Sequence, residues 1–180
     1  QHDAVLADAL SAAIATDAAA DGMAEMENTR PPLGGAGPNA YAQIAGSAAN
    51  LLAAPNGPDL GVLSLDGWDT HVNQGAETGQ LALRLAGLDA AVSAVKTRLG
   101  AHWDTTAVLV ITEFGRTVRI NGANGTDHGT GGCAFLTGGA VAGSGFVGDW
   151  PGLDRLYEDR DLYPANDLRS LLKGVLSEHW

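Results

Sequence analysis

The feature that most constrains this sequence is an amphipathic segment lying between two short apolar runs. Its apolar residues recur at alternating steps of four and three: Leu81, Leu85, Leu88, Val92, Val95 and Leu99. This spacing predicts a helix with one buried face, ended by Gly100. Residues 60–65 and 105–112 read as strands buried on both faces. A strand, a helix and a strand joined by a crossover of about forty residues favour parallel neighbours in an α/β sheet.

Weaker patterns predict the rest of the chain. Residues 3–20 are Ala-rich with helical spacing, and 21–38 form a loop rich in Gly and Pro. We expect a helix from Asn39 to near Pro55, a strand over 133–136, turns over 138–148 and a helix over 166–177. The chain thus divides into 1–38, a helix plus linker, and 39–180, part of an α/β domain. Because it lacks an initiator Met and opens in a helical pattern, we expect it to be the later portion of a longer protein.

Charge and cysteine content exclude several classes of function. The 180 residues hold 10 Lys and Arg against 21 Asp and Glu, a formal net charge of −11. Such a chain repels phosphate backbones and anionic lipids, so we expect no nucleic-acid partner. No apolar run approaches the length of a membrane span, so we expect no membrane insertion. The lone Cys133 excludes an intrachain disulfide and a cysteine-based zinc knuckle.

Three polar clusters follow apolar runs or lie in the next loop: residues 66–71, 112–117 and 126–129. Because the carboxyl ends of parallel strands meet at one edge of a sheet, we expect the first two to lie together, with the third folded over them. Carboxylate oxygens mixed with imidazole nitrogens suit zinc, manganese or a related divalent ion. The sequence therefore predicts a metal site.

Each candidate ligand also has a simpler interpretation. Asp69 and His71 are two residues apart, so both could face one ion from an extended segment, or merely hydrogen-bond each other. Glu113 is either a ligand, a solvated carboxylate or an ion-pair partner of Arg116. Asp127 could be an ordinary turn residue. His128, next to a glycine in a loop, has no apolar face to fill, which favours a functional role.

Other site types lack their signatures. There is no Gly-x-Ser-x-Gly elbow and no Walker loop, and the glycines of 125–132 do not follow a strand in the dinucleotide-binding pattern. A calcium loop starting at Asn121 lacks the bidentate Glu at its expected place.

Three motifs in order carry a family resemblance: Gly67-Trp68-Asp69-Thr70-His71-Val72-Asn73-Gln74, Thr112-Glu113-Phe114-Gly115-Arg116-Thr117 and Gly125-Thr126-Asp127-His128-Gly129. From about Asn39 to its C-terminus the chain resembles the C-terminal portion of domain-of-unknown-function family 1501, of the alkaline-phosphatase-like (sulfatase-like) superfamily. The resemblance implies a three-layer α/β/α sandwich with a mostly parallel sheet, incomplete here at its N-terminal side.

The resemblance also implies a site. Asp69 and His71 match a first pair of metal ligands, Glu113 a later carboxylate and His128 a loop histidine. Asp127 matches a further metal-site carboxylate that orients His128, with Asp66 in reserve. The implied cofactor is a divalent ion, most readily zinc or manganese, with calcium also compatible.

In function, the resemblance implies metal-dependent hydrolysis of a phosphate or sulfate ester in the full-length parent, with a small anionic ester as substrate. Arg116 would hold a non-bridging oxygen. Two features depart from the superfamily pattern: Phe114 stands where a second imidazole is usual, and no nucleophile is found before Asn39. The alternative is a non-catalytic binding or assembly domain that keeps the fold. Family members often carry a twin-arginine signal, which implies an exported or periplasmic protein, although this chain contains no such signal.

Overall fold

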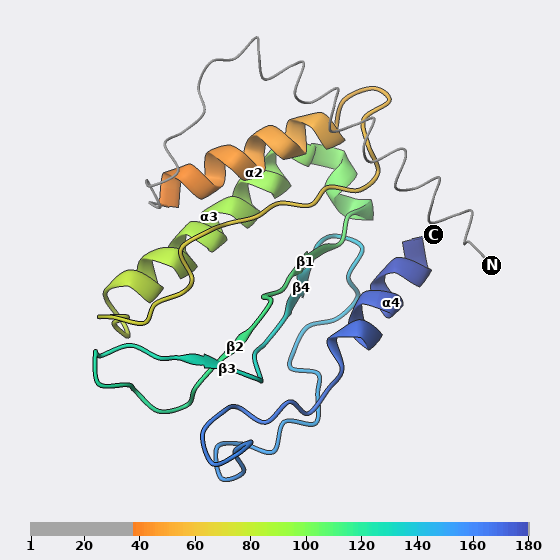
Figure 1. Cartoon of the computed structure of the whole chain (residues 1–180). Helices are drawn as coiled ribbons and strands as arrows, with labels where there is room; N and C mark the ends of the chain where they lie inside the picture. The colour runs from red at the N-terminus through yellow and green to blue at the C-terminus, as the bar shows by residue number, and fades with distance from the viewer. Residues whose placement is uncertain (1–37, 180) are drawn as a thin grey trace, which may run out of the picture.

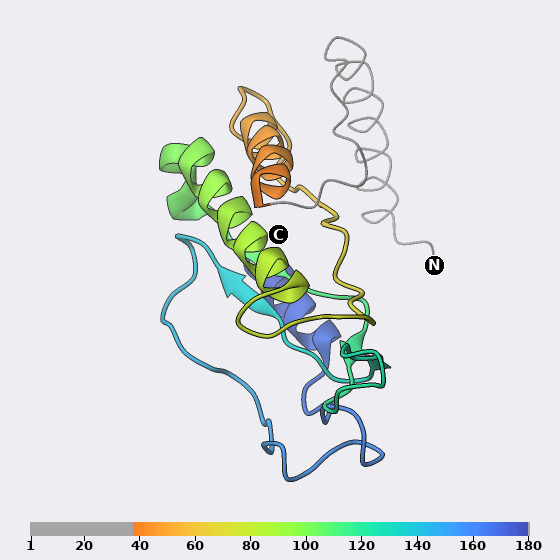
Figure 2. The same cartoon turned by 90° about the vertical axis from the view of Figure 1, so that its left-hand side faces the viewer.

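The computed structural model describes residues 38–179, so the helix expected over 3–20 and nearly all of the loop expected over 21–38 lie outside the described residues. The division of the chain into two parts stays a prediction. Two helices, α2 (Pro38–Leu52) and α3 (Gln80–Leu99), lie side by side (Figures 1 and 2). Both were predicted from their apolar spacing. None of the described helices is long and apolar enough to cross a membrane.

Small residues let α2 and α3 approach closely. Ala45 and Ala91 are buried between the helices, beside the ring of Tyr41. A Cβ added at Gly87 would lie 2.7 Å from that ring, so only glycine leaves room for it. Trp68 stacks on Tyr41 with ring centroids 6.4 Å apart. This contact brings the chain after residue 65 back onto the helix pair and fixes where the next loop begins.

The ends of the helices follow local capping chemistry. Gly100 adopts φ 56° and donates its N–H to the carbonyl of Lys96, which ends α3 where the sequence predicts. A 3-10 turn, η1 (Gly100–Thr105), continues the chain. Helix α4 (Leu168–His179) begins two residues after the predicted start, because the Asp167 carboxylate accepts the Arg169 backbone N–H at 2.9 Å.

The expectation of a mostly parallel, three-layer sandwich is wrong for the described residues. Their strands form two antiparallel pairs: β1 (Val108–Val110) with β4 (Phe135–Thr137), and β2 (Gly115–Arg116) with β3 (His128–Gly129). The predicted strand over 105–112 is shorter in the structure: β1 spans only Val108–Val110, and the first predicted residue, Thr105, belongs to η1. Its ladder partner is β4, which follows it in sequence, and not the run before α3.

The predicted strand over 60–65 is also wrong. These residues have no ladder with any strand in the described part of the chain. Val62 is 88% exposed and Leu63 is 44% exposed, whereas Leu65 packs on the helix core. A strand needs a neighbour to bind its N–H and C=O groups, and without one this apolar run stays irregular.

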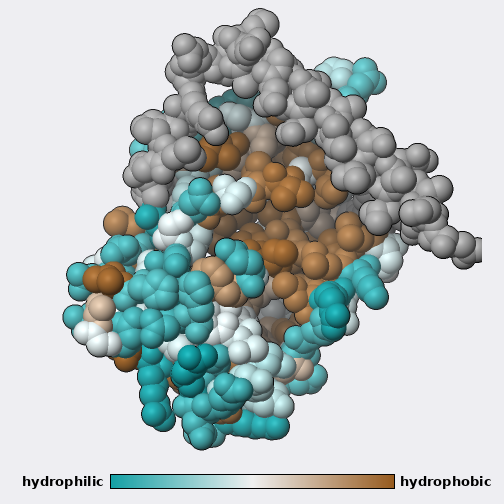
Figure 3. Space-filling model, viewed as in Figure 1, coloured by the Kyte–Doolittle hydropathy of each residue, from teal (hydrophilic) through white to brown (hydrophobic). Residues whose placement is uncertain are grey.

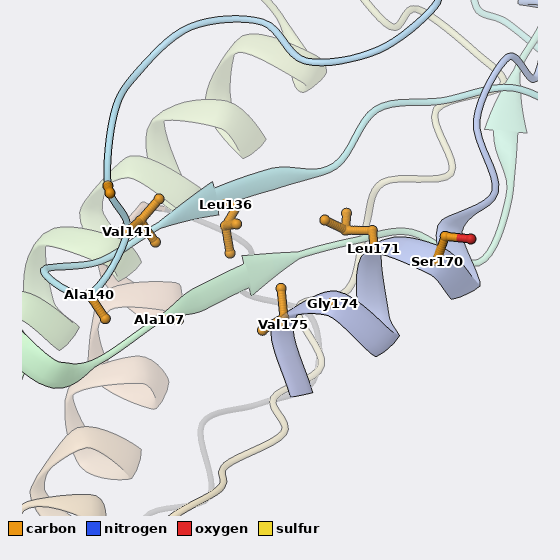
Figure 4. Close-up of a pocket in the computed structure, with 9 residues that line it drawn as sticks. Ala107, Leu136, Ala140, Val141, Ser170, Leu171, Gly174 and Val175 are labelled. Carbon is orange, nitrogen blue, oxygen red and sulfur yellow. The ribbon is translucent and has the colours of Figure 1, made fainter. Parts of the chain in front are cut away.

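The described surface has an apolar face and a polar end. Ala107 and Leu136 of the β1–β4 region and Leu171 and Val175 of α4 line an open apolar groove of about 410 Å³ (Figure 4). In the view of Figure 1, apolar residues gather at the centre and right of the space-filling surface, and polar residues gather at the lower left (Figure 3). The lower left is where β2 and β3 lie.

Candidate metal centre

Two loops distant in sequence are joined by backbone hydrogen bonds at the polar end. Asn73 N–H donates to the carbonyl of Ala123 at 3.0 Å, and Gln74 N–H to that of Asn124 at 2.9 Å. A Cβ at Gly125 would lie 2.1 Å from the backbone oxygen of His71, so glycine is required for this contact. Thr126 N–H also donates to the carbonyl of Thr70 at 3.3 Å, so the first and third polar clusters meet through their backbones, and not at the edge of a parallel sheet.

The β2–β3 ladder brings in the second cluster. Its register places Arg116 directly opposite His128 and Gly115 opposite Gly129. Because successive side chains alternate between faces, Arg116 and His128 share one face and the two glycines share the other. A Cβ at Gly115 would lie 1.9 Å from the backbone oxygen of Gly131. The glycines thus let the chain fold tightly behind the face that carries the functional side chains.

Three side chains converge on this face. The Oδ1 atom of Asp69 lies 2.9 Å from Nε2 of His71 and 2.8 Å from Nε2 of His128. One ligand atom from each lies within 4.8 Å of the others, so this group can hold a metal ion. The side chains are between 40% and 53% exposed, which leaves positions around an ion open to solvent.

The protonation chemistry of His71 favours a cation at this point. Its Nδ1 lies 3.0 Å from Oδ1 of Asp127, and its Nε2 faces Asp69. A neutral imidazole has one N–H, so whichever nitrogen carries it, the other turns a lone pair toward a carboxylate oxygen. A second proton or a metal cation relieves that repulsion. Ligands of a tetrahedral zinc ion lie about 3.4 Å apart, so the Asp69 oxygen needs to separate from each of the two histidine nitrogens by about half an ångström.

Arg116 holds the carboxylate of Asp69. Its Nη1 donates to Asp69 Oδ1 at 2.5 Å, while Nε and Nη2 donate to the side chain and backbone of Thr126 at 2.9 and 2.5 Å. The hydrogen bond from Arg116 is the main reason that the pKa of Asp69 lies below its ordinary value, and His128 adds to it. Asp69 is therefore kept in the anionic form that a metal ligand requires.

Asp127 orients His71, and not His128 as the resemblance implied. It accepts a hydrogen bond from Nδ2 of Asn121 at 2.9 Å in addition to its contact with the His71 ring. The donor of Asn121, followed by His71, lowers the pKa of Asp127. A carboxylate behind the ring directs Nε2 toward the site, which is the usual arrangement behind a metal-binding histidine.

The remaining predicted residues lie apart from the group. Glu113 is exposed in the turn between β1 and β2 and does not join the three converging side chains. The reserve candidate Asp66 is exposed as well, and its backbone oxygen accepts the Tyr41 hydroxyl. Of the five predicted metal-site residues, the structure brings together Asp69, His71 and His128, with Asp127 behind them.

Sequence reasoning missed several supporting residues. Gln74 accepts both the Thr70 and the Thr126 hydroxyl through Oε1, at 2.8 and 2.7 Å, which fixes the partner of Arg116. Asn121 accepts the backbone N–H of Ala123 at 2.9 Å through its side chain. The Asn-Gly-Ala-Asn-Gly run signals this Asx turn, because asparagine at the start of a turn bonds the backbone two residues on.

Another missed residue, Asp161, joins its own segment to the chain just after β3. Its carboxylate is 1% exposed and accepts the backbone N–H and hydroxyl of Thr130, each at 2.9 Å, and the Nε of Arg160 at 2.8 Å. Burial alone would raise the pKa of Asp161, but the hydrogen bonds outweigh it and the pKa is lowered. Nothing in the sequence near Asp161 marks it as buried.

Comparison with known proteins shows the family. The model of the family described as "Protein of unknown function (DUF1501)" matches residues 1–176, a wider span than the part from Asn39 that carries the motifs. Neither the curated proteins nor the solved structures gave a match. The three converging ligands come from the first and last of the motifs that carry the resemblance, and the middle motif supplies Arg116. The chain belongs to the DUF1501 family.

Proposed function

We propose that this chain binds one divalent metal ion, zinc or manganese, through Asp69, His71 and His128. The observation that carries the proposal is the placement of His71 between two carboxylates, 2.9 and 3.0 Å from its two nitrogens. Two imidazoles and one carboxylate are ligands that both ions accept, and calcium, which prefers oxygen ligands, fits this set less well.

We further propose that the full-length protein uses this ion to hydrolyse small phosphate or sulfate esters. The support is the open, half-exposed ligand set, since catalytic metal sites keep a position for water or substrate. An ion held there would polarise an ester oxygen and lower the pKa of a bound water. Export of the protein, as the resemblance implies, belongs to the same proposal.

In this arrangement the chain's own residues hold the metal ligands in place. Asp127 and Asn121 hold the ring of His71, and Arg116 holds Asp69. Because all three guanidinium nitrogens of Arg116 already donate to Asp69 or Thr126, its contacts favour a positioning role over the predicted clamp on an ester oxygen. The clamp stays a prediction that activity measurements have to test.

A non-catalytic binding domain is the second candidate. Among the described residues, those that hydrogen-bond to or stack on the three ligand side chains carry no hydroxyl or thiol that could act as a nucleophile. The nearby Thr70 and Thr126 hydroxyls both donate to Gln74. If a side-chain nucleophile is required, the described residues do not supply it at the site.

Metal content measured by plasma mass spectrometry tests the binding proposal. The full chain is loaded with Zn²⁺, dialysed and compared with His71→Ala, His128→Ala and the control His102→Ala, an exposed histidine outside the ligand group. We expect near-stoichiometric zinc in the wild type and control and almost none in the other two. A wild-type chain that folds but retains no zinc or manganese contradicts the proposal.

Activity then separates the two candidate functions. Turnover of nitrophenyl phosphate or sulfate that disappears with a chelator and returns with metal supports hydrolysis. Stoichiometric metal without turnover in the full-length protein favours the non-catalytic binding domain.

A further inference from the structure

The two histidines of the site are held by different means. His71 is fixed by hydrogen bonds, since Asp127 occupies its Nδ1 and is itself held by Asn121. For His128, the structure shows a polar contact only at Nε2, to Asp69, and no described residue hydrogen-bonds its Nδ1. A half-exposed ring with one polar contact can still rotate about its bonds, so something else has to fix its plane.

The ring of Phe114 supplies that restraint. It stacks on the His128 ring with centroids 4.1 Å apart and an interplanar angle of 16°. Phe114 lies in the bend just before β2, two residues before Arg116, and continuing the β2–β3 register makes it the diagonal neighbour of His128. The Arg116 guanidinium carbon also lies 5.8 Å from the Phe114 centroid.

We propose that Phe114 is a positioning residue for the metal ligand His128, holding its ring plane so that Nε2 points at the ion. This inference rests on the metal binding proposed above. It gives a function to the one position where the family resemblance implied a missing imidazole. The aromatic ring takes the place of a hydrogen-bonded partner behind the histidine, in the way that Asp127 serves His71.

Metal affinity tests the inference. The dissociation constant for Zn²⁺ is measured by competition with a chromophoric chelator for the wild type, Phe114→Leu, Phe114→Tyr and the control Phe146→Leu. Phe146 is a 74% exposed ring that makes a tilted contact with Trp150 and is not one of the residues that contact the three ligands. An aromatic stack is worth a factor of about two to ten, so we expect Phe114→Leu to bind zinc more weakly by that factor. Phe114→Tyr keeps the stack and should stay within about twofold of the wild type.

A second readout separates positioning from general stability. The visible spectrum of bound Co²⁺ should change in Phe114→Leu, because one ligand is less well oriented, while Phe114→Tyr keeps the wild-type spectrum. If Phe114→Leu fails to fold, Phe114→Ile takes its place, because it also removes the aromatic ring and keeps an apolar side chain in the bend before β2.

The outcomes distinguish the two proposals. If the wild type and Phe114→Leu bind zinc with equal affinity and give the same cobalt spectrum, the proposed role of Phe114 is wrong and the metal site stands. A wild type that binds neither metal overturns the metal site, and the inference with it.

Discussion

The polar end and the apolar face of this molecule are built on opposite principles. At the polar end, Thr70, Thr126 and Asp161 are nearly or fully buried, and no buried side-chain nitrogen or oxygen among the described residues lacks a partner. On the apolar face, Leu136 is 39% exposed and Phe135 is 51% exposed. The order of the site therefore comes from hydrogen bonds and close glycine contacts and owes little to apolar burial.

The comparison indicates which substitutions should most affect the stability of the fold or the affinity for metal. At the polar end, removing one buried hydrogen bond leaves a polar group unpaired, and adding a side chain at a closely packed glycine causes a steric clash. An exposed apolar side chain, by contrast, has little burial to lose. Four predictions test this, from the largest expected effect to the smallest.

Gly125→Ala should have the largest effect. Its Cβ would lie 2.1 Å from the backbone oxygen of His71 and 2.6 Å from that of Thr70, and backbone atoms cannot move aside singly. We expect a loss of about 3 kcal/mol in the free energy of unfolding, measured by urea denaturation. Gly122→Ala in the same loop is the control, because its Cβ would meet nothing within 4 Å. Equal effects of the two substitutions would refute the tight packing of the loops.

Asp161→Asn should cost about 2 kcal/mol at neutral pH, because the amide places a donor or a weaker acceptor opposite Thr130 and Arg160. The folded-state pKa of Asp161 is lowered from 3.8, so its contribution is present above that value and is lost as the pH falls through the folded pKa. The difference between wild type and variant should therefore shrink below about pH 4.

The control for this experiment is Asp167→Asn. Its exposed pair with Arg169 also lowers the pKa of Asp167, to about 2, yet solvent screens it. We expect a smaller loss from Asp167→Asn than from Asp161→Asn, and an equal or larger loss would contradict the importance of burial.

Asn121→Ala should weaken zinc binding about tenfold, because Asp127 loses the donor that holds it behind His71. The matched control is Asn166→Ala. Asn166 makes a similar pair with Asp149, its Nδ2 donating at 3.1 Å, outside the ligand group. Zinc titration of both variants decides the matter, and a control that loses as much affinity as Asn121→Ala would show that the effect is not local.

Gly174→Ala should have the smallest effect and the opposite sign. This glycine lies inside α4 beside the apolar groove, and its Cβ would meet nothing within 4 Å. Alanine is favoured over glycine in a helix by up to about 1 kcal/mol, so the variant should unfold at slightly higher urea concentration. Destabilisation would mean that the groove is more tightly filled than its open shape indicates.

The elements predicted correctly were those with a local signal. The apolar spacing and Gly100 placed α3, and a similar spacing placed α2 and α4, because helices depend on neighbours in sequence. Pairing of strands is not local. The run over 60–65 has the composition of a buried strand, but composition does not state which partner binds its backbone, and none of the described strands does.

The site was predicted in part, and for a wrong geometrical reason. Asp69, His71 and His128 do converge, although no parallel strands bring them together. Their residue types indicate metal ligands, and that indication does not depend on which backbone arrangement brings them together. The contacts of Gln74 with Thr126 and of Asp161 with Thr130 join segments 52 and 31 positions apart, so no local pattern could reveal them.

The separation of the ligands along the chain has a further consequence. Asp69 and His128 stand 59 positions apart, so holding both closes a long loop, at an entropic cost of about 4 kcal/mol. The hydrogen bonds between the two loops offset part of this entropic cost even without a bound ion. Metal binding and folding are therefore coupled, because a bound ion would hold the two ligand-bearing loops together. A substitution that destabilises either loop should weaken metal binding even when it touches no ligand.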